Sequence, residues 1–477
     1  MKKVIQMKMK TVSRLALVGI LALGLTTLVQ AKEKRSLEDS VAHHRAMEAI
    51  TWSIPLISSK MMRDGLKQDA GVGLNDVAYF SKIQNWKIDF TTNNDTTPYI
   101  HFFWNAEKEP VVIEIPPSTK DVGLVGTLLD FWQRSMIAVG ASGYDGGRGG
   151  KYLVMSPDYQ GSYPEGYTAV YQKTFNGSAT LRPIIKDTSP ATLKKVTAFV
   201  KGIKIYPLSK AKKPGATRHV DIFDKKINGL PPFNANYFKE LNEILQEERI
   251  EEKDLTFLGV LKSIGIEKGA PYNPDKNQIK MFDAAAKDAQ AYLRESYLEH
   301  AAPRFYDDRQ WTNAVPTSGV ISFMDWQFPS HVNYDERGAG YFGFYTSFRK
   351  LGTASFYLKV ARDEKAKRLS GSNNYKLTVP ANVPMRNFWS VIAYETEDAT
   401  WIDNVPKAGV ASIDKGLATN SDGTVDIYFS AKPPKGKEAN WVPTAAGENF
   451  FLFFRMYGPE KAVFDKSWKL NDLVKVN

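Results

Sequence analysis

The order of two hydrophobic patterns along the chain is the feature that most limits its fold. From about residue 85 to 187, and again after 315, short apolar and aromatic runs are separated by Gly, Pro, Asn and Asp. Such runs are typical of strands joined by tight turns. Residues 236–310 instead place apolar side chains at helical spacing. The sequence therefore predicts a mainly β protein with an α insert, in which two antiparallel β-domains are joined by a helical segment.

Individual elements can be assigned within this frame. A helix is expected over residues 36–66, with Pro55 kinking or ending it. The segment Asp121–Ala138 fits either a helix or strands. The remaining expected helices are Tyr237–Gln246, Asp254–Gly265 and Asp275–Leu298. The expected strands are Trp86–Phe90, Tyr99–Trp104, Val111–Ile115, Tyr152–Met155, Tyr167–Tyr171, Ala179–Ile185, Tyr375–Val379, Phe388–Tyr394, Thr424–Phe429 and Phe450–Tyr457.

The first 31 residues have the pattern of a secretory signal peptide. A basic start is followed by the apolar run Leu15–Val29 and by Val29-Gln30-Ala31, with small residues at the positions that signal peptidases read. We expect cleavage after Ala31 and a periplasmic or secreted protein without a membrane span; a retained anchor is the alternative. The expected division is signal peptide (1–31), N-terminal helical segment (32–84), β-domain (85–205), linker (206–235), helical connection (236–314) and second β-domain (315–477).

Charge and cysteine content exclude several functions. The formal charge is +11, and the five cations of the first 31 residues account for much of it, because their removal leaves +6. The small basic cluster of Lys210, Lys212 and Lys213 has no interleaved aromatic residues, so no nucleic-acid partner is expected. The chain has no cysteine, which excludes thiolate metal sites, thiol catalysis and a cysteine-linked lipid anchor.

Polar residues within the first β-domain are the candidate catalytic groups. Asn93, Asn94 and Asp95 form a polar knot before an aromatic strand; such residues commonly make turns, but they can also orient a substrate. Asp95 could act as a base if Asp130 and Arg182 converge on it. Arg182 lies in an apolar strand and needs a partner. Its partner is either a structural one, Asp130 or Asp187, or a substrate carboxylate.

A second set of residues is expected to bind rather than to react. His101 shares a strand face with Tyr99 and Phe103 if the alternation holds, as a packed histidine, a ligand or a base. Arg455, like Arg182, is a charged residue in an apolar strand and needs a partner. Among the aromatic residues, Trp389 and Trp441 either fill the core or line a cleft in which a sugar ring stacks. No cofactor or metal is expected, since no nucleotide fingerprint, serine elbow or metal-ligand spacing occurs.

These motifs, taken in order, resemble a known pairing of domains. The first half resembles the DUF1254 family and the second half resembles DUF1214. The resemblance implies two sandwich domains with jelly-roll-like character and a helical connection, and it implies no settled activity. The residues that carry it are Asn93-Asn94-Asp95-Thr96, the segment 109–116, Asp130, the turn 146–150, Leu181-Arg182, Leu369-Ser370-Gly371, Phe388-Trp389-Ser390, Asp422-Gly423, Asn440-Trp441 and the segment 455–459.

Three functions remain open at this point. The first is a cofactor-free hydrolase of a glycan, envelope polymer or amide, in which Asp95 and Asp130 divide the acid and base roles. The second is a non-enzymatic envelope protein that binds a glycan or small molecule between the β-domains. The third is a structural protein that forms homo-oligomers through the helices of 236–310.

Overall fold

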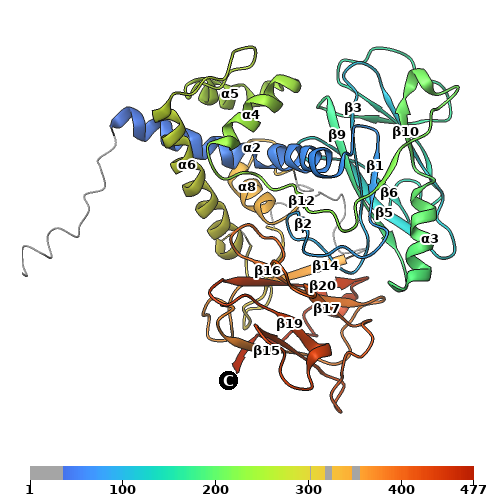
Figure 1. The fold of residues 1–477 in the computed structure, drawn as a ribbon, viewed down its shortest axis with the longest axis vertical. Helices are drawn as coiled ribbons and strands as arrows, with labels where there is room; N and C mark the ends of the chain where they lie inside the picture. Colours follow the sequence, from blue (N-terminus) through green and yellow to red (C-terminus); the bar gives the residue numbers. More distant parts are fainter. Residues whose placement is uncertain (1–35, 301, 317–324, 346–354, 477) are drawn as a thin grey trace, which may run out of the picture.

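The computed structural model describes residues 36–300, 302–316, 325–345 and 355–476. It contains two β-regions and a group of helices, and the long helix α2 (Leu37–Ala70) links the helices to the first β-region (Figure 1). Ser36 caps α2 by accepting a hydrogen bond from the backbone N–H of Asp39, and Gly71 ends it in the left-handed conformation with φ of 68°. The predicted signal peptide, residues 1–31, lies outside the described residues.

Helix α2 continues through Pro55, which the sequence analysis expected to kink or end it. A proline inside a helix removes one backbone donor and displaces the carbonyl groups of the preceding turn. Neighbouring side chains supply donors here. Arg337 donates to the carbonyl of Trp52 at 2.7 Å, and Gln133 donates to the carbonyl of Pro55 at 2.9 Å. Tertiary contacts therefore satisfy carbonyl groups of the helix before the proline and at the proline itself.

The first β-region consists of two main sheets with an apolar core between them. The six-stranded sheet has the order β11-β1-β3-β9-β5-β6, and the four-stranded sheet has the order β10-β4-β7-β8. Helix α3 (Pro190–Val200) contributes Val196 and Phe199 to this core. The strands are β1 (Val77–Tyr79), β3 (Ile100–Asn105), β4 (Val111–Ile115), β5 (Gly123–Asp130), β6 (Ser135–Gly140), β7 (Gly150–Met155), β8 (Thr168–Tyr171), β9 (Asn176–Ile184), β10 (Lys204–Pro207) and β11 (His219–Asp221), beside the small pair β2 (Ile88–Asp89) and β12 (Ile227–Asn228).

The helices pack around α2 on the other face of the six-stranded sheet. They are α4 (Asn236–Glu247), α5 (Leu255–Lys262), α6 (Lys276–Glu295) and α8 (Tyr334–Phe342), with a π-helical turn over Ser296–His300 at the end of α6. One core cluster joins these helices to both β-regions, since it contains Phe103 of β3, Phe282 of α6 and Phe451 of the C-terminal β-region. None of the described helices is long and apolar enough to span a membrane.

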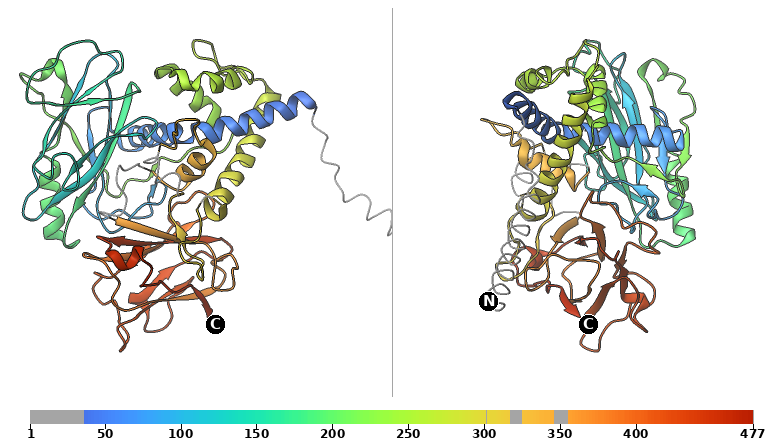
Figure 2. Two further views of the ribbon diagram at one scale, coloured as in Figure 1. Left: turned by 180° about the vertical axis from the view of Figure 1, so that it is seen from behind. Right: turned by 60° about the vertical axis from the view of Figure 1, so that its left-hand side comes forward.

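The second β-region also has two sheets, and its upper sheet faces the rest of the molecule (Figures 1 and 2). That sheet has the order β13-β14-β20-β16-β17, and the lower sheet has the order β19-β18-β15-β21. A separate apolar core lies between them. The strands are β13 (Thr312–Asn313), β14 (Ser355–Val360), β15 (Asn374–Val379), β16 (Trp389–Glu395), β17 (Gly409–Ala411), β18 (Val425–Ser430), β19 (Trp441–Pro443), β20 (Phe450–Tyr457) and β21 (Val474–Val476); the short helix α9 (Lys461–Phe464) follows β20.

The expected fold class needs two corrections. Three of the described sheets are mixed rather than antiparallel, because β1 pairs with β11, β7 with β8, and β18 with β19 in parallel; the sheet β13-β14-β20-β16-β17 is antiparallel, as expected. No closed sandwich or jelly roll is identified among the described elements. The ambiguous segment Asp121–Ala138 forms strands β5 and β6, which pair as a hairpin. The fold is therefore mixed α/β, with several sheets and a long N-terminal helix.

Candidate functional site

The polar knot of residues 92–97 is a turn that joins the two β-regions. The side-chain oxygen of Asn94 accepts hydrogen bonds from the backbone and hydroxyl of Thr96, at 3.1 and 2.8 Å. Its amide donates to the hydroxyl of Tyr457 on β20 at 2.7 Å, and the hydroxyl of Tyr394 on β16 donates to the carbonyl of Asn93 at 2.5 Å. Asn94 is fully buried. The knot is therefore a turn, and it docks on tyrosines of the C-terminal β-region.

Strand β20 presents Arg455 to this turn because its side chains alternate between two buried faces. Phe450, Leu452, Phe454 and Met456 point into the core of the C-terminal β-region, whereas Arg455 lies on the opposite face. Its guanidinium donates to the carbonyl of Thr92 at 2.7 Å and to the hydroxyl of Tyr394 at 2.6 Å. The Arg455 side chain is 3% exposed.

Strand β9 presents Arg182 to the same junction from the N-terminal β-region. One nitrogen of its guanidinium donates to the hydroxyl of Tyr357 at 3.1 Å, and another donates to the hydroxyl of Tyr99 at 2.7 Å. Its central carbon lies 5.8 Å from the ring centre of Tyr457, and that of Arg455 lies 4.8 Å from the ring centre of Tyr357. We call Arg182, Arg455, Tyr99, Tyr357, Tyr394 and Tyr457 the arginine–tyrosine cluster.

The two arginines of this cluster lack an anionic hydrogen-bonding partner. Within the described part of the chain, no carboxylate forms an ion pair with Arg182 or Arg455. The Nε atoms of both are buried without a hydrogen-bond partner among those residues. A buried charge that is not paired by an opposite charge is costly, so such a pair of guanidinium groups is prepared to receive an anion.

Electrostatics within the cluster shift the pKa of Tyr357. Burial alone raises the pKa of its phenol, but the positive charges of Arg182 and Arg455 outweigh burial and lower the pKa to about 8. Asp95 lies at the edge of the cluster, where burial and the charge of Asp414 raise its pKa to about 6 against the attraction of Arg455. Both groups therefore titrate closer to neutral pH than an exposed tyrosine or aspartate does.

One side of the cluster is less buried than the other. Arg182, Tyr99, Tyr357 and Asp95 are half-buried. Arg455, Tyr394 and Tyr457 are buried, and they lie on the upper sheet of the C-terminal β-region. The cluster therefore combines partly exposed polar groups with the buried guanidinium group of Arg455. Ligand sites commonly place a few polar groups at fixed positions in this way.

Asp130 does not join Asp95 and Arg182. On β5, Val125 lies opposite Arg182 whereas Asp130 lies opposite Gly177, so about 16 Å of strand separates the two positions. The carboxylate of Asp130 binds Arg134 at 2.6 Å, and Arg134 also binds Glu251 at 3.0 Å. The expected ion pair between Arg182 and Asp130 or Asp187 is wrong, because tyrosine hydroxyls take the place of a carboxylate; Asp187 instead accepts hydrogen bonds from Ser189 and Thr192.

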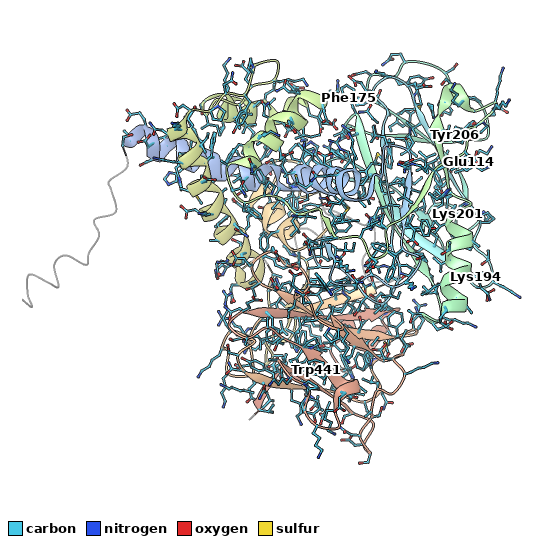
Figure 3. The ribbon with its side chains drawn as sticks, viewed as in Figure 1. Glu114, Phe175, Lys194, Lys201, Tyr206 and Trp441 are labelled. Carbon is cyan, nitrogen blue, oxygen red and sulfur yellow. The ribbon has the colours of Figure 1, made fainter. Side chains whose placement is uncertain are left out.

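The other predicted binding residues, His101, Trp389 and Trp441, are not members of the arginine–tyrosine cluster. His101 shares its strand face with Tyr99, as expected; it contacts Thr180 at 3.1 Å, and burial lowers its pKa to about 3, so it is a neutral packed histidine. Trp389 stacks on Phe454 in the core of the C-terminal β-region. Trp441 lies on the lower sheet, away from the junction (Figure 3), where its indole donates to the carbonyl of Ser430 at 2.8 Å.

Tyr357 is the site residue that sequence reasoning missed. Strand β14 was not predicted, because its residues SFYLKV alternate little. Tyr394 and Tyr457 lie in predicted strands whose aromatic residues the sequence assigned either to the core or to a cleft. The signal that could have found them is Arg455, since an arginine in a strand implies polar or anionic neighbours on the same face. Among the described residues, no group of three or more His, Asp or Glu side chains could hold a metal ion.

The geometry can now be compared with known proteins. Two family models match the chain: Protein of unknown function (DUF1254), over residues 74–207, and Protein of unknown function (DUF1214), over residues 354–461. The chain therefore contains a DUF1254 domain and a DUF1214 domain, which confirms the resemblance. Tyr99 and Arg182 lie in the first matched region, and Tyr357 and Arg455 lie in the second. The cluster is thus built by both domains.

A search of solved structures supports the fold. The VPA0106 protein from Vibrio parahaemolyticus is 18% identical, with a TM-score of 0.54, and the match covers 91% of this chain and 100% of that chain. At this identity the likeness shows the fold alone. An uncharacterized protein from Burkholderia cenocepacia is 12% identical, with a TM-score of 0.39, over 92% of this chain and 96% of that chain; no argument rests on it. No curated protein matches the chain.

Proposed function

We propose that the arginine–tyrosine cluster binds a small ligand through a carboxylate group, between the DUF1254 and DUF1214 domains. The observation that carries this proposal is the pair of guanidinium groups, Arg182 and Arg455, that tyrosines and backbone carbonyls hold in place while no carboxylate among the described residues neutralises them. The two cations come from different domains and meet at Tyr357. A ligand carboxylate would supply the missing negative charge.

The chemistry of the cluster favours a carboxylate over a neutral ligand. A guanidinium group presents paired N–H donors that match the two oxygens of a carboxylate. The unpaired Nε atoms of Arg182 and Arg455 are further donors. Tyrosine hydroxyls can rotate to donate to or accept from polar groups on the rest of the ligand, and their rings offer apolar faces. Sugar acids and other hydroxy acids combine these features.

A thermal-shift series tests this function. Acetate, malonate, galacturonate and gluconate would be added at constant ionic strength, with glucose as the uncharged comparison. We expect at least one carboxylate to raise the melting temperature in a saturable way, because a ligand that binds only the folded state stabilises it. Glucose should have no effect.

Substitutions then locate the binding site. Arg455→Gln and Arg182→Gln should each weaken binding at least tenfold, since each removes a charge from the cluster. Arg309→Gln is the matched control, because Arg309 pairs with Asp308 in the C-terminal β-region and takes no part in the cluster. If no carboxylate stabilises the protein, or if both cluster variants bind like the control, the proposal is wrong.

Hydrolysis of a glycan or amide is a second candidate function, and it depends on Asp95. Burial and the charge of Asp414 raise the pKa of Asp95 to about 6, which suits a group that exchanges protons near neutral pH. Asp130 is engaged by Arg134, so it does not serve as the second carboxylate. Loss of glycosidase or amidase activity in Asp95→Asn, with ligand binding retained, would support this function; unchanged activity would contradict it.

We also propose export by residues 1–31, on the basis of the sequence pattern alone. Expression of the full chain in a bacterium, followed by fractionation and N-terminal sequencing, tests this. A periplasmic or secreted product that begins at Lys32 is expected. A cytoplasmic product that retains the first 31 residues would contradict the proposal.

A further inference from the structure

The phenol of Tyr357 contacts both guanidinium groups of the cluster; the hydroxyl of Tyr99 also accepts a hydrogen bond from Arg182, at 2.7 Å. The hydroxyl of Tyr394 donates its proton to the carbonyl of Asn93, and that of Tyr457 accepts from the amide of Asn94. The Tyr357 oxygen instead accepts from the guanidinium of Arg182 at 3.1 Å, and its ring lies 4.8 Å from the central carbon of Arg455. It is also half-buried, whereas Tyr394 and Tyr457 are buried.

These contacts favour the ionised form of Tyr357. The groups that face it are Arg182 on β9, Arg455 and Tyr457 on β20, and the Ser355 hydroxyl on β14 itself. Two of these groups are cations and Ser355 supplies a hydrogen bond, so together their interactions stabilise the phenolate form of Tyr357. Burial opposes ionisation, and the net result is a pKa of about 8. A substantial fraction of Tyr357 is therefore phenolate in mildly alkaline solution.

We propose that Tyr357 is a catalytic base that removes the proton from the carbon next to the bound carboxylate, in a β-elimination on a sugar acid of the uronate type. This inference rests on the proposed function, since Arg182 and Arg455 must first hold the substrate carboxylate. Their charges would also stabilise the enolate that forms when the proton leaves, which is the main obstacle to taking a proton from such a carbon.

The reaction balances without a co-reactant. The phenolate oxygen of Tyr357 takes the α-proton, and the electron pair of the broken C–H bond forms a double bond between the α and β carbons. The β C–O bond breaks, and its electron pair leaves with the oxygen. The neutral phenol then returns the proton to that oxygen, so that an alcohol leaves, an unsaturated acid remains, and Tyr357 is again a phenolate. No oxidation or reduction occurs.

The surroundings of Tyr357 suit a sugar ring. Tyr99 and Phe388 are half-buried aromatic residues on two sides of the cluster, and Phe388 stacks on Tyr457 with ring centres 4.2 Å apart. Sugar rings pack their apolar faces on such rings. A uronate unit in a polymer combines a carboxylate, an acidic α-proton and a β-linked oxygen that can leave. Uronate polymers are therefore the substrate class that this site fits.

The test combines binding and turnover in the same protein. Galacturonate is the binding probe, and polygalacturonate and alginate are the substrates; formation of the double bond is followed by ultraviolet absorbance. A fully methyl-esterified pectin, which lacks the carboxylate charge, is the control polymer. We expect elimination from at least one acidic polymer, with a rate that rises with pH around pH 8, and little from the ester.

Single substitutions distinguish the role of Tyr357 as the base from the role of Arg455 in binding the carboxylate. Tyr357→Phe should lower the elimination rate at least 100-fold, remove the rise near pH 8, and change the affinity for galacturonate less than threefold. Tyr428→Phe is the matched control, because Tyr428 lies on the lower sheet at β18 and should react like the unaltered protein. Arg455→Gln should lose binding as well as turnover.

Each contrary outcome has a distinct meaning. If galacturonate binds but neither polymer is cleaved, or if Tyr357→Phe cleaves at the unaltered rate, the role of Tyr357 is wrong while carboxylate binding stands. If galacturonate does not bind but another carboxylate does, the uronate class is wrong. If no carboxylate binds, both the proposed function and this inference fail.

Discussion

At the scale of the residue, Asp95 lies in an environment that disfavours its negative charge, because it is half-buried and near Asp414. Its folded pKa of about 6 lies above that of an unfolded aspartate, so this group contributes stability at pH values below about 4 and loses that contribution as pH rises through about 6. Asp95→Asn should therefore stabilise the protein by roughly 1–2 kcal/mol at pH 7.5, after allowance for partial solvent screening, and by little at pH 4.

Urea denaturation of the unaltered protein and of Asp95→Asn at both pH values measures this difference. Asp308→Asn is the matched control, since Asp308 is an exposed partner of Arg309 and Lys469. A stabilisation that persists unchanged at pH 4 would show that the charge of Asp95 is not its cause, and a loss of stability at pH 7.5 would show that Asp95 is a structural group. A stabilised variant would instead indicate a residue retained for its chemistry.

Single residues also show where sequence reasoning reached its limit. Arg182 and Arg455 were recognised because a cation in an apolar strand must have a partner, and that argument needs only the local pattern. The identity of the partner depends on which strands meet. Arg182 contacts Tyr357, which lies 175 residues away. No local pattern reports such a pairing, so the sequence offered Asp130 and Asp187 as structural partners, and neither of them pairs with Arg182.

At the scale of the element, strands that form continuous apolar runs were predicted, whereas a strand with weak alternation and the parallel pairings were not. Strands β4 and β20 have the predicted bounds, because each is a continuous apolar run between turn residues. Strand β14 was missed because its residues alternate little, and the parallel pairing of β18 with β19 was missed because parallel partners are not joined by a short turn. The segment that forms the hairpin of β5 and β6 could not be told from a helix, because it is long enough for a helix yet rich in strand-forming residues.

A buried lysine of strand β14 contacts the turn at the end of helix α6, and it leads to a second prediction. Lys359 is 1% exposed, its ammonium group donates to the carbonyl of Tyr297 in the π-helical turn, and it lies 3.8 Å from the ring centre of that tyrosine. Burial lowers its pKa to about 7, well below that of an unfolded lysine. The stability that depends on neutral Lys359 is therefore present above about pH 10 and is lost as pH falls towards 7.

Lys359→Met should remove the free-energy cost of burying an ionisable side chain. We expect a stabilisation of roughly 1–3 kcal/mol at pH 7 that shrinks towards pH 10, because the methionine never needs to lose a proton, although the bond to the Tyr297 carbonyl is lost. Chemical denaturation at the two pH values gives the answer, with the largely exposed Lys469→Met as control. A destabilised variant at pH 7 would mean that the ammonium contacts outweigh burial.

The hairpin of β5 and β6 depends on an ion-pair chain that carries a third prediction. Asp130 is 2% exposed, and its carboxylate accepts hydrogen bonds from the backbone N–H of Trp132 and Arg134 and from the Arg134 side chain. Asp130→Ala leaves these donors without an acceptor and should cost about 3–5 kcal/mol of stability. Carboxylate binding by the folded variant should remain within threefold of the unaltered protein, since Asp130 lies away from the cluster.

Melting curves and galacturonate titrations of Asp130→Ala measure both effects. Asp308→Ala again provides an exposed comparison, which should cost less than about 1 kcal/mol. Loss of binding in a variant that still melts cooperatively would restore Asp130 to the site. A negligible change in stability would mean that the ion-pair chain does not hold the hairpin.

At the scale of the whole molecule, the domain junction is part of the core rather than a contact between finished domains. Phe451 and Phe453 of β20 belong to the same buried cluster as Trp52 of α2 and Phe282 of α6. Arg455 and Tyr457 on the same strand face bind the turn of residues 92–97. The DUF1214 region by itself would expose this whole face, which is larger and more apolar than isolated soluble domains usually present.

We therefore expect residues 36–477 to unfold as one cooperative unit in calorimetry, with the calorimetric and van't Hoff enthalpies of unfolding agreeing within about 20%. A fragment of residues 354–477 should aggregate or remain unfolded, because the exposed strand face of β20 has lost the helices and the turn that cover it. Two separate calorimetric transitions, or a soluble fragment with well-dispersed amide resonances, would contradict this expectation. Either result would mean that the domains fold independently, and a ligand at the arginine–tyrosine cluster would then act by joining them instead of entering an assembled site.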